Sequence, residues 1–283
     1  HCQTHHTYLE CSQSTLYEAL FSAVDARDLP GMTDVDASLL YFCSLVARHN
    51  KVTLTGECAD EIFGGYPWFH RKEMYMQNTF PWSYDLSPRI VLFKDDFINS
   101  LPLKEYVDDA YETSINQCPH TDGETITEYN RRKISWLNIR WFMMTLLNRM
   151  DRCSMYSGLE ARGPFADYRI LEYVFNVPWE YKCYNNQVKS LLVECGKKYL
   201  PPEILYRKKS PYPKTYDPTY EKLLGTIVIE EYKSNNKLQK YIDYNKLIKF
   251  INSPKDYGKP WYGQLMAGPQ MLAYVLQISY MLR

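Results

Sequence analysis

A short β-branched segment, Lys51 to Thr55 (KVTLT), is the feature that most constrains the fold of this sequence. It lies between a segment with helical periodicity, about Asp36–His49, and a turn at Gly56 that opens a further helix. Helix, strand and then a loop into a helix is the pattern of open, mostly parallel α/β sheets, whose ligands bind beyond the carboxyl ends of the strands. The sequence therefore predicts a buried strand with a ligand site directly after it.

Helical segments surround this strand and dominate the second half of the chain. Thr15 and Glu18 have the spacing of a capping box, and the apolar residues around them share one helical face: Leu16, Leu20, Ala23 and Val24. His5–Glu10 alternates weakly and is interpreted as a strand. Further helices are expected over residues 126–152, 167–177 and 189–199, the first of them deep in a helical body. We expect one α/β domain, residues 1–283, with a partial parallel sheet and a large helical C-terminal half.

The composition argues against a nucleic-acid-binding protein and against a membrane protein. Lysine plus arginine equals aspartate plus glutamate at 33 each, so no broad basic surface is expected. The apolar C-terminal run, residues 263–283, is interrupted by glutamines and a proline, which favours a buried helix over a membrane span. Eight scattered cysteines without a C-x-x-C pair, and the lack of a signal peptide, favour reduced thiols and a cytoplasmic location.

Three carboxylates follow the predicted strand within five positions: Glu57, Asp60 and Glu61. Gly56 lets a ligand approach the backbone, and the next helical turn offers free N–H groups that favour a phosphate. At this position Glu57 suits a general base, and Asp60 suits a ligand of Mg²⁺. The alternative is that these acids merely favour the helix N-terminus and lie in water.

Two further positions are candidates for binding. Arg162 lies in a segment expected to be an ordered loop and can grip a carboxylate with two hydrogen bonds; the alternative is a structural ion pair, for example with Asp167. Lys189 begins a predicted helix, where a cation opposes the helix dipole. That placement is explained by a nearby polyphosphate, and otherwise Lys189 is a surface lysine.

Several long motifs resemble one family. Residues 54–70 (LTGECADEIFGGYPWFH) resemble the segment of the glutamine-hydrolysing asparagine synthetases that usually reads Leu-Ser-Gly-Glu, two small residues, Asp-Glu, an apolar pair and Gly-Gly-Tyr. Residues 157–169 (SGLEARGPFADYR) resemble the family's Gly-Leu-Glu-x-Arg-x-Pro-Phe-x-Asp loop, and residues 199–220 and 261–282 look like a bacterial branch. The resemblance covers nearly the whole chain and keeps the motifs in order.

The resemblance implies a fold and a reaction. The fold is an adenine-nucleotide α-hydrolase-like domain of the ATP-pyrophosphatase type. The family uses ATP and Mg²⁺ to convert aspartate into a β-aspartyl-adenylate and pyrophosphate, and ammonia then displaces AMP to give asparagine. The ammonia comes from glutamine through a tunnel from a glutaminase domain, which normally lies N-terminal in the same chain. A homodimer is compatible with this resemblance.

The resemblance also assigns roles to residues. Thr55 and Gly56 are expected to contribute to the ATP site, and Glu57 is the expected base for incoming ammonia. Asp60 is the expected ligand of magnesium pyrophosphate. Lys189 matches the family lysine that steadies the phosphates and the charge developing in the transition state.

Arg162 and Asp167 match the family loop and are assigned to substrate binding. The sequence also departs from the pattern: Thr55 replaces the usual serine, and Gly163 and Ala166 replace larger apolar residues. The family's Ser-Gly-Gly-x-Asp-Ser phosphate loop and its glutaminase domain are absent from this sequence. We therefore expect an N-terminally truncated synthetase domain that is inactive by itself.

Two alternatives remain open at this point. One is a related amide- or β-lactam-forming synthetase that activates another carboxylate. The cyclising relatives tend to carry tyrosine at the position of Glu57, so this glutamate favours ammonia as the nucleophile. The other alternative, supported by the missing phosphate loop, is a non-catalytic remnant that uses the fold to bind a partner.

Overall fold

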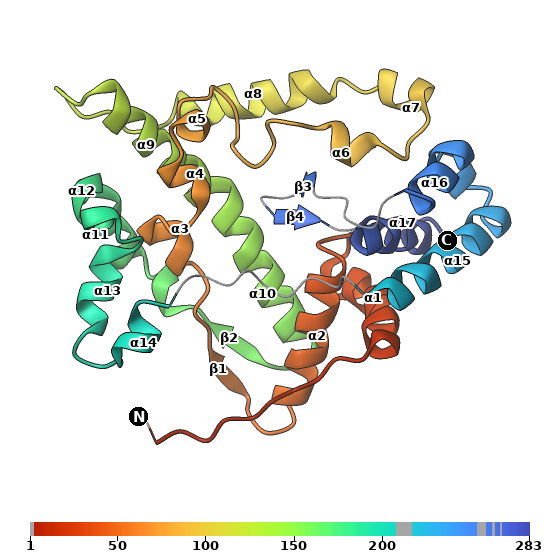
Figure 1. Cartoon of the computed structure of the whole chain (residues 1–283), viewed down its shortest axis with the longest axis horizontal. Helices are drawn as coiled ribbons and strands as arrows, with labels where there is room; N and C mark the ends of the chain where they lie inside the picture. The colour runs from red at the N-terminus through yellow and green to blue at the C-terminus, as the bar shows by residue number, and fades with distance from the viewer. Residues whose placement is uncertain (1–2, 208–216, 254–258, 262–263, 267) are drawn as a thin grey trace.

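A computed structural model describes residues 3–207, 217–253, 259–261, 264–266 and 268–283 (Figure 1). Its longer α-helices are α1 (Gln13–Arg27), α2 (Asp34–Val46), α8 (Leu103–Ile115), α9 (Ile126–Leu137), α10 (Met144–Tyr156), α11 (Tyr168–Asn176), α15 (Pro218–Ser234), α16 (Tyr244–Ile251) and α17 (Gly268–Met281). The shorter ones are α3 (Ala59–Phe63), α4 (Pro67–His70), α5 (Lys72–Tyr75), α6 (Ser87–Ile90), α7 (Asp95–Asn99), α12 (Trp179–Lys182), α13 (Ser190–Gly196) and α14 (Pro202–Leu205).

The remaining elements are a π-helix, three 3₁₀ turns and four strands within the described residues. The π-helix is η1 (Asn138–Met143), and the 3₁₀ turns are η2 (Pro164–Ala166), η3 (Tyr184–Asn186) and η4 (Leu238–Lys240). The strands are β1 (Val52–Leu54), β2 (Glu160–Arg162), β3 (Lys259–Trp261) and β4 (Gln264–Met266).

The predicted strand forms β1 and pairs in parallel with β2, so that Thr53 lies opposite Ala161. β2 falls in a segment predicted to be a loop, which corrects that prediction. The expected burial of β1 is also wrong, since Val52 is 42% exposed and Leu54 is 72% exposed. Among the described residues β2 is the one strand paired with β1, so the opposite edge of β1 has no strand beside it. β3 and β4 form a separate antiparallel pair.

The main hydrophobic core lies between α1, α2, α10, α15 and α17 (Figure 1). The four residues predicted to share the inner face of α1 are all buried: Leu16, Leu20, Ala23 and Val24. The helix begins three residues earlier than expected, because the Ser12 side chain accepts a hydrogen bond from the backbone N–H of Thr15. The predicted capping box of Thr15 and Glu18 is therefore wrong, and Ser12 is the N-cap.

The long helix expected over residues 126–152 is a continuous helical path through α9, η1 and α10. A capping box opens it, in which Thr125 and Glu128 bond each other's backbone N–H groups. The expectation that its middle is deeply buried holds on one side only, since Trp141 and Met144 are exposed. Asn138, the first residue of the π-helix, is fully buried and donates a hydrogen bond to the carbonyl of Glu61 at 3.1 Å. The helix thereby fixes the segment that follows β1.

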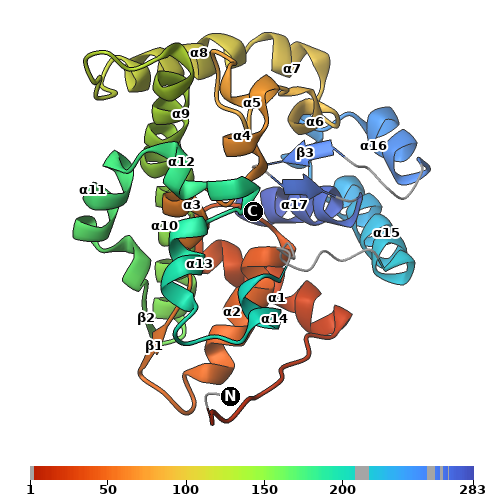
Figure 2. The same ribbon diagram turned by 60° about the vertical axis from the view of Figure 1, so that its left-hand side comes forward.

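The other helix predictions are largely confirmed. α11 and α13 lie within the predicted ranges, and Figure 2 shows α11–α14 grouped along the side of α3 and α10. α17 is buried along most of its length, as expected for a packing helix. His5–Glu10 forms no strand and is exposed. In the part of the chain that the structure describes, no helix combines the length and apolar character that crossing a membrane requires.

Candidate active site

The segment from Thr55 to Glu61, here named the β1–α3 turn, leads from the end of β1 into α3. The Thr55 hydroxyl accepts a hydrogen bond from the backbone N–H of Glu57 at 3.3 Å, and Cys58 adopts a left-handed conformation with a φ of 76°. Gly56 is exposed, and a Cβ added to it would have no atom within 4 Å. Open space therefore lies beside the backbone at the position where the sequence predicts ligand approach.

Asp60 and Lys189, which lie far apart in the sequence, are brought together by the fold. The Lys189 Nζ lies 2.9 Å from Asp60 Oδ1, and both side chains are partly exposed. Lys189 precedes α13 with a left-handed φ of 56°, and its carbonyl accepts the N–H of Val193. Gly65 makes room for the acid, because a Cβ there would fall 1.9 Å from Asp60 Oδ1. The pair places a cation and a carboxylate at one partly exposed edge of the turn.

Glu57 is held by an arginine that the sequence analysis did not single out. Arg149 on α10 donates from Nη2 to Glu57 Oε1 at 3.0 Å, and its own side chain is buried. Its Nη1 contacts Met32 Sδ at 3.4 Å. Burial opposes the charge, but the carboxylates of Glu57 and Asp36 raise the pKa of Arg149 above its ordinary value. The pair orients Oε1 of Glu57 toward α10.

Replacing Arg149 with methionine is expected to destabilise the protein by about 3–5 kcal/mol. The loss of the guanidinium leaves the carboxylate of Glu57 partly buried with no charge to compensate it. Urea unfolding measures the change. Arg152→Met is the matched control, since Arg152 pairs with the exposed Asp28 and should cost about 1 kcal/mol or less. Similar small losses in both variants would contradict the structural role given to Arg149.

Glu61 differs from its two acidic neighbours because it is buried and bonded within the protein. The Tyr66 hydroxyl donates to Glu61 Oε1, and the Glu61 backbone accepts from Asn138. Burial raises the pKa of Glu61, and the charges of Asp60 and Glu57 raise it further. The three carboxylates are thus within electrostatic reach of one another, and Glu61 serves to anchor the turn.

The raised pKa of Glu61 predicts a pH-dependent effect on stability. A carboxyl with a higher pKa in the folded state contributes stability below its unfolded pKa, and this contribution is lost as pH rises through the folded pKa. Glu61→Gln is permanently neutral, so the wild type should lose stability relative to this variant as the pH rises from the ordinary pKa of glutamate through the raised pKa of Glu61. Urea unfolding at several pH values measures the difference, and a pH-independent difference would contradict the assignment.

Arg162 and Asp167 do not pair with each other, which corrects the structural alternative considered for them. Arg162 and Glu160 lie two residues apart on one face of β2 and pair at 2.8 Å. Asp167 caps α11 and pairs with Arg169 at 2.6 Å. The side-chain hydrogen bond from Arg169 lowers the pKa of Asp167 to about 2. The link of Arg162 to the β1–α3 turn is its carbonyl, which accepts the N–H of Thr55 at 2.9 Å.

The site thus combines a backbone open to a ligand, an ammonium beside a carboxylate, and a second carboxylate fixed by a buried arginine. Comparison with known proteins identifies the family to which this site belongs. The model of the family described as asparagine synthase matches residues 1–282.

The chain belongs to the asparagine synthase family.

Curated relatives agree with this membership. The chain is 45% identical over 280 residues to asparagine synthetase [glutamine-hydrolyzing] 3 of Bacillus subtilis. The aligned region covers 97% of this chain and 45% of that protein. It is 25% identical over 214 residues to asparagine synthetase [glutamine-hydrolyzing] 1 of the same species, over 64% of this chain and 34% of that protein. A putative asparagine synthetase [glutamine-hydrolyzing] 1 of Methanocaldococcus jannaschii is 22% identical over 270 residues, 83% of this chain and 40% of that protein. The chain spans less than half the length of each of these relatives.

Membership of the asparagine synthase family confirms the resemblance on which the fold prediction rested. The fold is of the adenine-nucleotide α-hydrolase-like type, here with a small parallel sheet and a mostly helical body. Arg149 is the site residue that sequence reasoning missed. The signal for it was present, since an arginine on a mostly apolar helical segment needs a buried acidic partner.

Proposed function

We propose that the full-length protein containing this chain makes asparagine from aspartate, ATP and ammonia, with ammonia released from glutamine by a glutaminase domain. Family membership supports the reaction class, and the similarity to asparagine synthetase [glutamine-hydrolyzing] 3 of Bacillus subtilis supports the substrates. The observation that carries the proposal is the Asp60–Lys189 pair, whose carboxylate lies on the same turn as Glu57. A cytoplasmic location and a homodimer are further predictions.

In the first step, an oxygen of the aspartate side-chain carboxylate attacks the α-phosphorus of ATP. A new O–P bond forms as the bond to pyrophosphate breaks. The space beside Gly56 admits the phosphates, and the Lys189 ammonium stabilises negative charge that develops as pyrophosphate leaves. The Thr55 hydroxyl holds the backbone of Glu57 and so keeps the turn in shape. These residues bind and orient the reactants.

In the second step, ammonia attacks the activated carbonyl and AMP leaves. The nitrogen must lose one proton to become the amide of asparagine. We assign that proton to Glu57, whose Oε1 is fixed by Arg149 and whose Oε2 is the accepting atom. The buried arginine therefore acts as a positioning residue for the base.

Magnesium fits the donor set of the turn. Within the described residues, no three His, Cys, Asp or Glu side chains gather to hold a metal ion. Mg²⁺ bound with a nucleotide needs only one or two carboxylates, since phosphate oxygens and water supply the other ligands. Asp60 would hold it, and the bound ion would neutralise charge on the phosphate oxygens.

Pyrophosphate release by the full-length protein tests the proposal. With ATP and magnesium present, release should depend on aspartate, and adding glutamine or ammonium should give asparagine and AMP in equal amounts. The same assay should be run with other amino-acid carboxylates in place of aspartate. Release with another acid and none with aspartate would eliminate the assignment.

A further inference from the structure

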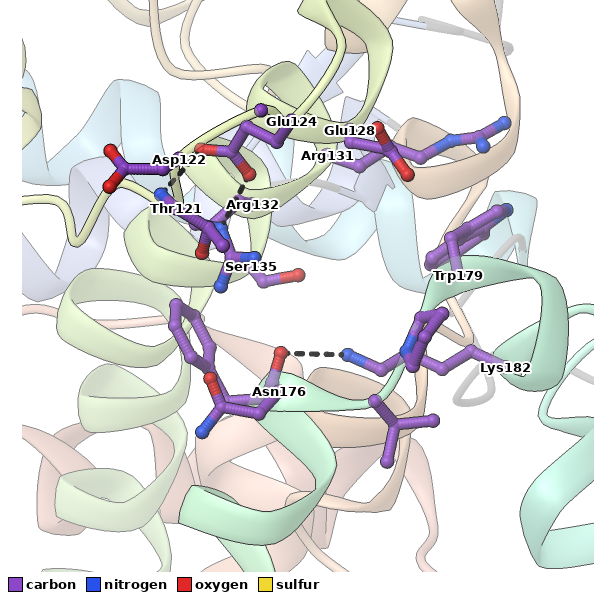
Figure 3. A pocket seen from close by; sticks show the side chains of 14 residues that line it. Thr121, Asp122, Glu124, Glu128, Arg131, Arg132, Ser135, Asn176, Trp179 and Lys182 are labelled. Carbon is purple, nitrogen blue, oxygen red and sulfur yellow. Dashed lines mark hydrogen bonds and ion pairs between the residues drawn. The ribbon is translucent and has the colours of Figure 1, made fainter.

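A cavity lies away from the β1–α3 turn, between α9, α11 and α12 (Figure 3). Its volume is about 340 Å³, which is within the range of small-ligand sites. Phe175 and Trp179 contribute aromatic surface, and the loop from Thr121 to Glu124 forms one side. Neither Lys189 nor any residue of the β1–α3 turn lines it. Its contents would therefore bind separately from the proposed reactants.

Lys182 is the residue that gives this cavity its chemistry. Lys182 is only 4% exposed, yet no carboxylate among the described residues pairs with its ammonium. Its Nζ makes one long hydrogen bond, 3.4 Å, to the carbonyl of Phe175. Figure 3 shows the ammonium reaching across the cavity, with the Ser135 hydroxyl directed toward the same space. A buried ammonium has three donors and normally requires charged or polar acceptors.

The acids around the cavity are committed to other partners or lie at its edge. Glu124 pairs with Arg132 at 2.9 Å, and Glu128 closes the capping box with Thr125. Asp122 is exposed on the loop. Burial, together with the charge of Arg132, lowers the pKa of Lys182 to about 8, as expected for an ammonium that lacks a neutralising neighbour.

The aromatic part of the cavity is fixed by a second cation. The Arg131 guanidinium lies 5.0 Å from the ring centroid of Tyr75 and 5.0 Å from that of Trp179. This stacking holds Trp179 at the side of the cavity, and Phe175 is stacked edge-on against Trp136 with their centroids 6.3 Å apart. Two held rings and a buried ammonium form an amphipathic site.

We propose that this cavity binds a small organic anion, with a phosphate or carboxylate group on Lys182 and Ser135 and a planar ring against Phe175 and Trp179. The anion supplies the acceptors that the buried ammonium lacks. The ring replaces water against the aromatic side chains, which is favourable by the hydrophobic effect. This site is separate from the proposed asparagine-forming reaction and does not depend on it.

Isothermal titration calorimetry of the full-length protein with phenyl phosphate tests the proposal. We expect saturable binding, at least about tenfold tighter than inorganic phosphate, because the ring adds apolar contact. Lys182→Met, which keeps much of the side-chain length, should weaken phenyl phosphate binding at least about tenfold. Phe175→Leu should weaken phenyl phosphate binding and leave that of inorganic phosphate unchanged.

Two controls locate the binding. Lys249→Met makes the same substitution at an exposed lysine of α16, at the opposite end of the molecule from α12, and should bind as the wild type does (Figure 1). Lys189→Met should also retain binding, which separates this cavity from the β1–α3 turn. Circular dichroism should show Lys182→Met folded, with a melting midpoint at or above that of the wild type, since the variant buries no charge. Unchanged binding in Lys182→Met, or equal affinity for inorganic phosphate, would overturn the proposal.

Discussion

Glu57→Gln in the full-length protein is expected to reduce asparagine formation by about 100-fold or more while aspartate-dependent pyrophosphate release continues. Glutamine keeps an oxygen for the Arg149 hydrogen bond but is not basic, so it cannot take the proton that ammonia loses. The two products report different steps, because pyrophosphate leaves before ammonia attacks. The variant should therefore separate activation of aspartate from formation of the amide.

Parallel assays of pyrophosphate and asparagine measure this separation. Glu230→Gln is the matched control, since Glu230 is an exposed glutamate on α15. It should leave both products unchanged. Circular dichroism should confirm that Glu57→Gln is folded, because the variant removes the charge opposite the buried Arg149. Equal loss of pyrophosphate and asparagine in a folded variant would rule out the role of base.

Lys189→Met is expected to act on the earlier step. Removal of a cation that stabilises developing charge typically lowers kcat by about 100- to 1000-fold, so pyrophosphate release itself should fall by that factor. Methionine keeps much of the length of the side chain without its ammonium. The Asp60 carboxylate then loses the partner 2.9 Å away.

The rate of pyrophosphate release at saturating ATP and aspartate measures this loss. Lys198→Met provides the control, because Lys198 is an exposed lysine a short distance along the same segment. Asparagine formation should fall in parallel in Lys189→Met, unlike the pattern expected for Glu57→Gln. A Lys189→Met variant with wild-type pyrophosphate release would show that the pair with Asp60 is structural only.

Local patterns predicted the elements whose faces are set by periodicity. The inner face of α1 was predicted residue by residue because apolar spacing determines which side chains meet the core. The turn after β1 was predicted because a glycine follows a β-branched segment and precedes a helical one. The meeting of Asp60 with Lys189 followed only from family resemblance, since no local pattern relates two residues so far apart.

The two errors about the strands β1 and β2 share a cause, which is dependence on contacts distant in sequence. β2 is three residues long and is defined by its pairing with β1, so its own sequence carried little signal. The exposure of β1 depends on what lies beside it, and strand propensity cannot report that. The start of α1 was misplaced for a local reason, since Ser12 and Thr15 are both good N-caps and the choice depends on the backbone. The cavity around Lys182 requires three helices to meet and could not be read from any one of them.

The most direct test of the proposed chemistry follows an oxygen atom. The full-length protein is incubated with ATP, magnesium, ammonium and aspartate carrying ¹⁸O in its side-chain carboxylate, and the AMP is analysed by mass spectrometry. If aspartate is activated as its adenylate, one labelled oxygen should appear in AMP and none in pyrophosphate. Unlabelled AMP accompanying newly formed asparagine would contradict the account.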